Sequence, residues 1–153
     1  MMRRPLQTTA APALKVLHNQ FPVETRGDCD IIDVTQEIQR IVQKAGIDGG
    51  MMVACVAGST AALTTIENEP GLLKDFKTAV ERLLPSNLPY AHDAAWGDGN
   101  GHAHLRASII GPSVTIPIHN GTLKLGTWQQ IVLIDFDNRS RRREIFVQMI
   151  GVG

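Results

Sequence analysis

Two segments of the chain carry apolar residues at helical spacing. The first follows Asp33 or Thr35, either of which can cap a helix, and Gly46 ends it. The second covers residues 72–84, and Pro85 closes it. The pattern therefore predicts two helices, both in the N-terminal two thirds of the chain.

The remaining apolar segments are short and are typical of strands. We expect strands at residues 14–25, 50–57, 108–110, 113–118, 127–136 and 144–150. Residues 61–65 fit either a strand or a helical turn, and residues 85–103 are expected to form a long functional loop. From residue 105 onward the chain is expected to be all-β. Strands gathered in the C-terminal half, with two or three helices, predict an α+β fold.

Composition and net charge limit the classes of protein to which the chain can belong. The chain has 153 residues, of which 43% are hydrophobic and 20% charged, which fits one globular domain over residues 1–153 with a loose arm at residues 1–13. Fifteen basic and fifteen acidic residues give a net charge of zero, so we expect neither a nucleic-acid partner nor a membrane partner. Two cysteines without a CxxC motif favour a reducing cytoplasm.

Histidines concentrate in the region of the expected loop. Four of the five lie between residues 92 and 119. In a strand, His102 and His104 would share one face and could share a cation, with Asp93 or Asp98 adding an oxygen ligand. A solvated loop whose histidines complete turn hydrogen bonds fits the same pattern, and the residues alone leave both readings open.

Candidate anion ligands lie elsewhere in the chain. Ser59 and Thr60 form a small hydroxylated turn after an apolar strand, a frequent place for phosphate oxygens to bind. Glu67 follows as a base or a ligand, or as part of a solvated loop. Arg106 can bind phosphate through its guanidinium, and Trp128 either walls a flat ligand or packs in the core.

Basic and glycine-rich turns allow two readings each. The arginines at residues 139–143 suit phosphate or carboxylate, but such a cluster at a hairpin is more typical of a solvated edge. Residues 98–101 read as a nest of N–H groups for an anion or as a plain tight turn.

Four segments taken together resemble the YjbQ-like family, described as secondary thiamine-phosphate synthase-like. They read GSTAALTTIEN at residues 58–68, YAHD at residues 90–93, HLRAS at residues 104–108 and LGTWQ at residues 125–129. The resemblance runs from about residue 15 to the end of the chain. It implies a YjbQ-like α+β fold with β-sandwich-like sheets, a homotrimer, and a site near subunit boundaries that holds a metal or an anion. Many relatives carry a His-Thr pair where this chain has Gly58-Ser59, which makes His102 the candidate replacement.

The activity that the resemblance implies joins a pyrimidine diphosphate to a thiazole phosphate and releases pyrophosphate, assisted by a divalent metal ion, Mg or Zn. The catalytic candidates are Glu67, His92, Asp93 and His104. The candidates for binding the phosphorylated substrate are Ser59, Thr60, Asn68, Arg106 and Trp128. The metal candidates are His92, His102, His104 and His119. A metal-dependent hydrolase using the same cluster and a non-enzymatic trimeric small-molecule binding protein are the alternatives.

Overall fold

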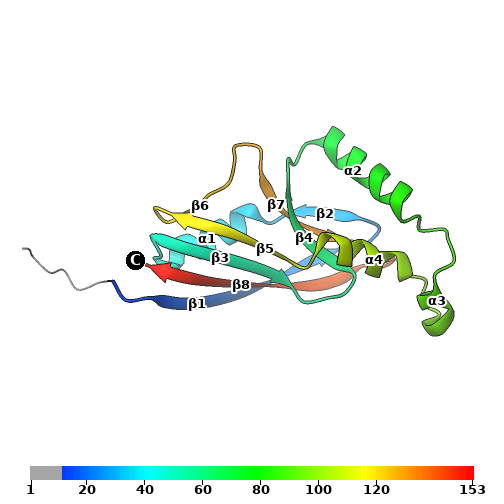
Figure 1. Ribbon diagram of the computed structural model, residues 1–153, viewed down its shortest axis with the longest axis horizontal. Coiled ribbons are helices and arrows are strands. Elements are labelled where there is room, and N and C mark those ends of the chain that lie inside the picture. The colour runs from blue at the N-terminus through cyan, green and yellow to red at the C-terminus, as the bar shows by residue number, and fades with distance from the viewer. Residues whose placement is uncertain (1–11) are drawn as a thin grey trace, which may run out of the picture.

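Two antiparallel sheets and four helices make up the computed structural model, which describes residues 12–153 (Figure 1). The five-stranded sheet has the order β1 (Lys15–Thr25), β8 (Arg141–Val152), β3 (Gly49–Val56), β5 (Ser113–His119) and β6 (Thr122–Leu123). The three-stranded sheet has the order β2 (Asp30–Asp33), β7 (Gln130–Asp135) and β4 (Ala61–Ile66). The helices are α1 (Thr35–Ala45), α2 (Pro70–Leu83), α3 (Ala91–Trp96) and α4 (Gly101–Ile110).

Strand β7 is buried on both faces, which explains its continuous run of apolar residues. Ile131 and Leu133 face the core between the two sheets. Val132 and Ile134 face a second core, which also contains Ala103 and other residues of α4. The short sheet is therefore a middle layer, with the long sheet on one side and helices α2 and α4 on the other.

Helix α1 forms as predicted and fills the inter-sheet core. Its apolar stripe places Ile38 and Val42 in that core, where both are fully buried. Gly46 ends the helix in the left-handed region at φ 62°, as a C-terminal glycine commonly does. The Asp33 side chain accepts the backbone N–H of Thr35 at the helix start.

Helix α2 is also confirmed, although it begins earlier than predicted. Pro70 occupies the first turn and Glu69 caps it, accepting the N–H groups of Gly71 and Leu72 at 2.8 Å each. No residue of α2 is fully buried; the helix lies on the second core through half-buried side chains such as Phe76 and Val80. Apolar packing by itself therefore holds this helix only weakly.

The region after residue 85 differs most from the prediction. The expected strand at residues 108–110 is wrong, and so is the expectation of an all-β chain from residue 105, because α4 continues to Ile110. A short apolar run does not by itself distinguish a strand from a helix end, and the alanines that favour a helix here also pack against the short sheet. Helix α3 lies inside the expected loop, and residues 61–65 belong to strand β4.

Most of the remaining strand predictions are confirmed with shifted ends. The strands expected at residues 14–25, 50–57, 113–118, 127–136 and 144–150 correspond to β1, β3, β5, β7 and β8. The predicted α+β class with sandwich-like sheets is confirmed. Residues 1–11 of the expected N-terminal arm lie outside the described residues. Within the described part of the chain, no helix is long and apolar enough to cross a membrane.

A buried ionic network joins the two sheets. Arg143 of β8 is only 8% exposed, and its guanidinium donates two hydrogen bonds of 2.7 Å to the Asp135 carboxylate of β7. The same guanidinium donates to the Thr60 hydroxyl at 2.7 Å, and this hydroxyl donates to Asp137 at 3.0 Å. Arg141 adds a bond of 2.8 Å to Asp137. The arginine-rich hairpin is therefore only partly a solvated edge, since Arg143 points inward.

Arg143→Ala should lower the free energy of unfolding by roughly 3–5 kcal/mol, because it leaves the buried carboxylate of Asp135 without its partner. Arg142 is the matched control: it is the next residue, its side chain is 65% exposed, and its ion pairs are long. Arg142→Ala should change stability by less than about 0.5 kcal/mol. Urea unfolding of the two variants measures the difference, and similar small losses in both would contradict this role of Arg143.

Candidate functional site

The junction of α3 and α4 brings together the histidines and aspartates that the sequence places on a loop. Helix α3 ends at Gly97 with φ 71°, and α4 starts at Gly101, whose N–H donates to Asp93 Oδ1 at 2.8 Å. A side chain at Gly101 is excluded, because a Cβ there would lie 2.6 Å from Tyr90 Cβ. This close approach sets α4 directly against α3.

His92 of α3 and His104 of α4 face each other across this junction. Their ring centroids are 4.4 Å apart. His92 Nδ1 lies 3.3 Å from Asp98 Oδ1 and 3.8 Å from Asp93 Oδ1, yet it is buried and makes no hydrogen bond among the described residues. Ligand atoms of His92, Asp93 and Asp98 all lie within 4.8 Å of one another. We call His92, Asp93, Asp98 and His104 the α3–α4 cluster; the donor atoms of His92, Asp93 and Asp98 could hold a divalent cation, and the His104 ring lies beside His92.

The loop that carries Asp98 is tied to the buried ionic network. Asn138 donates from its side-chain nitrogen to the backbone oxygen of Asp98 at 2.7 Å, and its own N–H donates to Asp137 at 2.9 Å. The amide nitrogen of Asn100, in the orientation that pairs donor with acceptor, lies 3.1 and 3.2 Å from the carboxylate oxygens of Asp98. The cluster is therefore positioned by contacts with the turn between β7 and β8 as well as by its own helices.

A depression of about 550 Å³ adjoins the cluster at His104. Its polar groups are the hydroxyls of Ser59 and Ser108, and Ser108 donates to the backbone oxygen of Leu105 at 2.9 Å, which leaves its oxygen free to accept. No lysine or arginine lines the depression in the described part of the chain. A phosphate bound there would need another source of positive charge.

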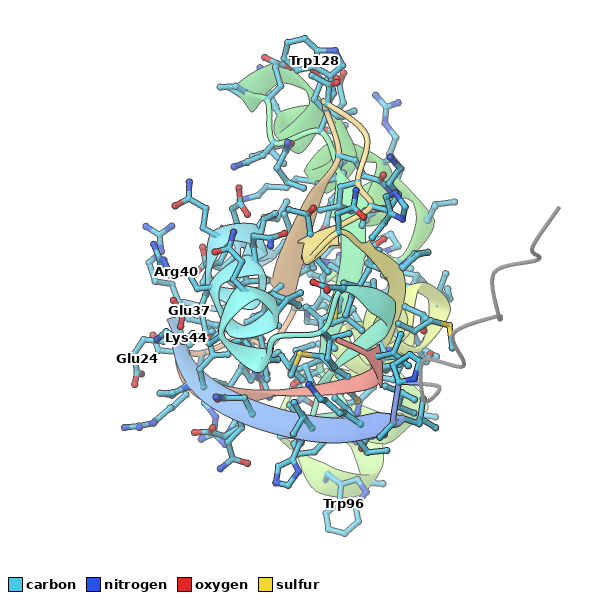
Figure 2. The ribbon with its side chains drawn as sticks, turned by 90° about the vertical axis from the view of Figure 1, so that its left-hand side faces the viewer. Glu24, Glu37, Arg40, Lys44, Trp96 and Trp128 are labelled. Carbon is cyan, nitrogen blue, oxygen red and sulfur yellow. The ribbon has the colours of Figure 1, made fainter. Side chains whose placement is uncertain are left out.

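The structure separates several predicted ligands from this cluster. Glu67, Asn68 and Trp128 surround a different pocket, at the end of β4 opposite Ser59. Figure 2 shows Trp128 and Trp96, the last residue of α3, at opposite extremities of the molecule. Within one chain, Glu67, Asn68 and Trp128 therefore do not come near His92 and His104.

Two more predicted ligands lie outside the depression. The hydroxyl of Thr60 is buried and already bonded to Arg143 and Asp137, so it has little capacity left for a phosphate. His119 ends strand β5, whereas α4 precedes the start of that strand, which puts His119 about 20 Å away along the strand. One chain does not bring His119 to the cluster.

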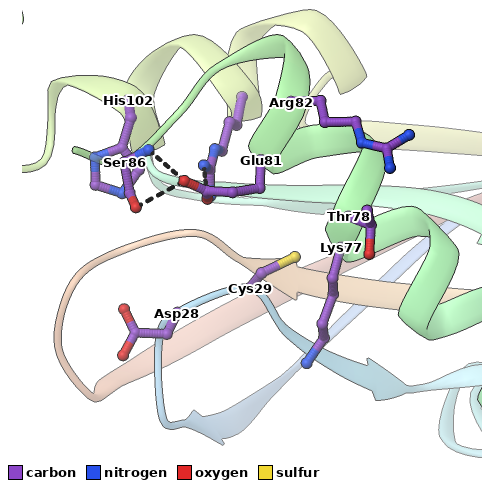
Figure 3. Close-up of a pocket in the computed structure, with 9 residues that line it drawn as sticks. Asp28, Cys29, Lys77, Thr78, Glu81, Arg82, Ser86 and His102 are labelled. Carbon is purple, nitrogen blue, oxygen red and sulfur yellow. Dashed lines mark hydrogen bonds and ion pairs between the residues drawn. The ribbon is translucent and has the colours of Figure 1, made fainter. Parts of the chain in front are cut away.

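The prediction that His102 and His104 share a face is wrong, because they lie on a helix rather than a strand. Residues two apart on a helix point about 200° apart. His102 and Arg106, one turn apart, line a cavity beneath α2 instead (Figure 3). There Arg106 donates to Glu81 at 2.5 Å and to the backbone oxygen of Leu84 at 3.0 Å. His102 therefore cannot join His104 on one cation while α4 is helical.

Comparisons with known proteins cover nearly the whole chain. The family described as UPF0047 protein YjbQ-like matches residues 19–152. A UPF0047 protein of Methanothermobacter thermautotrophicus is 34% identical over 138 residues, covering 90% of this chain and 94% of the relative. One of Archaeoglobus fulgidus is 36% identical over 126 residues, covering 82% and 96%.

Solved structures give the same result. The crystal structure of a YbjQ-like protein of unknown function from Sulfolobus solfataricus P2 superposes with a TM-score of 0.86 at 34% identity, covering 91% of this chain and 99% of that one. A hypothetical protein from Aeropyrum pernix K1 gives a TM-score of 0.82 at 33% identity, with coverage of 88% and 98%. The matched region includes the α3–α4 cluster and both sheets.

The position of Arg106 can be tested through the pKa of Glu81. The N–H of Ser86 and the guanidinium of Arg106 lower the pKa of this carboxyl from 4.5 to about 2. The carboxylate's contribution to stability is thus present above pH 4.5 and is lost as the pH falls toward 2. Carboxyl-detected NMR titration should give about 2 in the native protein. Arg106→Gln should raise the pKa only part of the way, since the Ser86 bond remains.

A native pKa near 4.5 would mean that Arg106 is not held by Glu81, and that its guanidinium is available elsewhere.

Proposed function

This chain belongs to the UPF0047 YjbQ-like family, and on that premise we propose that it is a metal-dependent enzyme acting on a phosphorylated small molecule. The observation that carries the proposal is the double position of His104. Its ring lies against that of His92 in the α3–α4 cluster, with the ring centroids 4.4 Å apart, and it also lines the depression with Ser59 and Ser108. A cation and a phosphate group would therefore be neighbours.

The donor set of the cluster fits a divalent cation. The imidazole of His92 and the carboxylates of Asp93 and Asp98 combine nitrogen and oxygen ligands, and His104, whose ring lies against His92, is our candidate for a second nitrogen ligand. This set suits Zn²⁺ or Mn²⁺ better than Mg²⁺, since Mg²⁺ prefers oxygen alone. The Nδ1 atom of His92 supports the assignment because it is buried without a hydrogen-bond partner in the described residues. Such a group is costly unless something binds it.

The chain's own groups bind and orient the substrate. The Ser59 hydroxyl donates to a phosphate oxygen, while Leu105 and Ala107 cover the apolar side of the depression. A bound divalent cation would supply the positive charge that stabilises a departing pyrophosphate. Asp93 keeps His92 and the start of α4 in place through its bond to the Gly101 N–H. Positioning and charge are thus the main contributions of the protein.

For the reaction, we propose transfer of the thiamine-phosphate synthase type, in which a pyrimidine diphosphate is joined to a thiazole phosphate with release of pyrophosphate. Such a transfer asks for little covalent participation by the protein. That requirement agrees with a site whose polar groups are hydroxyls, imidazoles and carboxylates rather than an activated nucleophile. Both thiols fit this view: Cys29 is buried in the second core, and Cys55 lies on β3 away from the cluster.

We also propose that the protein is a homotrimer, with the outer face of the five-stranded sheet buried between copies. No described element covers this face. Val16, Ile150, Met51 and Pro117 form one row across four strands, with Val16 60% exposed and Met51 52% exposed. A contiguous apolar patch of this kind is typical of an interface. A neighbouring copy could then bring His119 or the Trp128 pocket to the cluster.

The metal-dependent activity can be tested with His104→Ala. We expect the native protein to bind Mn²⁺ or Zn²⁺ and to form thiamine phosphate from the two precursors. Loss of one ligand should weaken metal affinity by at least about 100-fold and reduce turnover to background. Calorimetry and product analysis measure the two effects. Glu37→Gln is the matched control, since Glu37 is an exposed carboxylate on α1, outside both the cluster and the sheet face.

Three outcomes would contradict this proposal. Full activity in His104→Ala would exclude the α3–α4 cluster as the catalytic site. Hydrolysis of a single phosphoester without an acceptor would indicate a metal-dependent hydrolase, and binding of the precursors without turnover would indicate a binding protein.

The trimer can be tested with Met51→Glu, which places a charge in the centre of the apolar row. Light scattering should give three times 16.7 kDa for the native protein and a smaller mass for the variant. Leu83→Glu is the control, because Leu83 is 78% exposed on α2, away from the sheet face. A native monomer, or an unchanged mass in Met51→Glu, would contradict this interface.

A further inference from the structure

A second cavity, of about 500 Å³, lies on the other side of α4 from the α3–α4 cluster. Its walls come from α2, from α4 and from the turn between β1 and β2 (Figure 3). It shares no lining residue with the depression beside His104. We call it the α2–α4 cavity; its volume is in the range of sites for small molecules.

Two buried side chains of α4 line this cavity and have unused hydrogen-bonding capacity. His102 and Arg106 are each 5% exposed. His102 Nδ1 is buried and makes no hydrogen bond among the described residues, a state that is rare for buried polar atoms in folded proteins. Arg106 donates from Nε and Nη2 to Leu84 and Glu81, and its Nη1 donates to no described residue. A ligand in the cavity could bond both groups.

The charges around the cavity favour an anion. The negative charge of Glu81 is already compensated, because Arg106 donates to one of its oxygens and Ser86 donates twice to the other. Lys77 and Arg82 of α2 form no ion pair within the part of the chain that the structure describes. Asp28 is the other acidic residue in the cavity wall, and the nearby Asp30 is already paired with Arg26. Positive charge is therefore in excess at the cavity, although the net charge of the whole chain is zero.

The thiol in the cavity wall does not point to covalent or metal chemistry. Burial raises the pKa of Cys29 to about 11, so it remains protonated at neutral pH. A protonated thiol is neither a nucleophile nor a good metal ligand. The cavity is thus suited to reversible binding.

We propose that the α2–α4 cavity is a second ligand site, which binds a small molecule through a phosphate or carboxylate group. The anionic group pairs with Lys77 and with the free Nη1 of Arg106, and a further polar atom of the ligand bonds His102. This proposal does not depend on the metal-dependent activity, because the two sites share no residue.

Binding of an anion would also stabilise the packing of α2 on α4. That helix buries no residue fully and is linked to α4 through Glu81 and Arg106. An anion held jointly by Lys77 of α2 and Arg106 of α4 adds a second link of the same kind. Amide hydrogen exchange in α2 should therefore slow when the site is filled.

The test is an NMR titration of the isotope-labelled protein with inorganic phosphate, and separately with acetate, in the presence of a chelator so that no divalent cation is bound. We expect saturable shifts confined to residues 77–86 and to His102 and Arg106. Saturation by phosphate alone would identify a phosphate ester as the ligand class, and saturation by acetate as well would include carboxylates. No saturation by either at ~20 mM would overturn the proposal.

Variants on the same helix locate the site. Lys77→Gln should raise the dissociation constant for phosphate at least about fivefold, whereas Lys74→Gln, one turn earlier and outside the cavity, should change it less than about twofold. Lys77 is exposed, so its replacement leaves the fold intact, unlike that of Arg106. His104→Ala should bind phosphate normally. Equal effects of both lysine variants, or loss of binding in His104→Ala, would overturn the assignment.

Discussion

The bidentate bond between Arg143 and Asp135 is the constraint on which the rest of the structure depends. It is a buried charged link between the long sheet, which contributes Arg143, and the short sheet, which contributes Asp135, and the Thr25 hydroxyl of the long sheet donates to the same carboxylate. Through Thr60 and Asp137 the same network fixes the turn before β4, and through Asn138 it reaches the loop that carries Asp98. The pairing of the sheets and the geometry of the candidate metal site are therefore parts of one network.

The sequence was sufficient wherever the structure is determined by local periodicity. Helix α1 shows an apolar stripe, a polar start and a glycine end, and all three are found where the pattern predicts them. Strand β8 is rich in β-branched and aromatic residues over its second half, which is the composition typical of a strand. These elements are specified by residues close together in sequence, which is why single-sequence reasoning identifies them.

Where tertiary contacts decide, the sequence was not sufficient. Helix α4 was predicted as strand because Ser108, Ile109 and Ile110 form a short apolar run, and only its packing on the short sheet shows that it is a helix. The same error led to the prediction that His102 and His104 share one face. The meeting of His92, Asp98 and His104 was foreseeable from their closeness in sequence, but the support from Asn138 was not, since it comes from forty residues away.

The central claim is that the α3–α4 cluster holds a divalent cation. Its most direct test is an anomalous difference map from crystals of the protein grown with Mn²⁺ or Zn²⁺. The account predicts one strong peak per chain bounded by His92, His104 and Asp98. A map with no peak there, or with the metal bound at His119 or at exposed carboxylates instead, would contradict it.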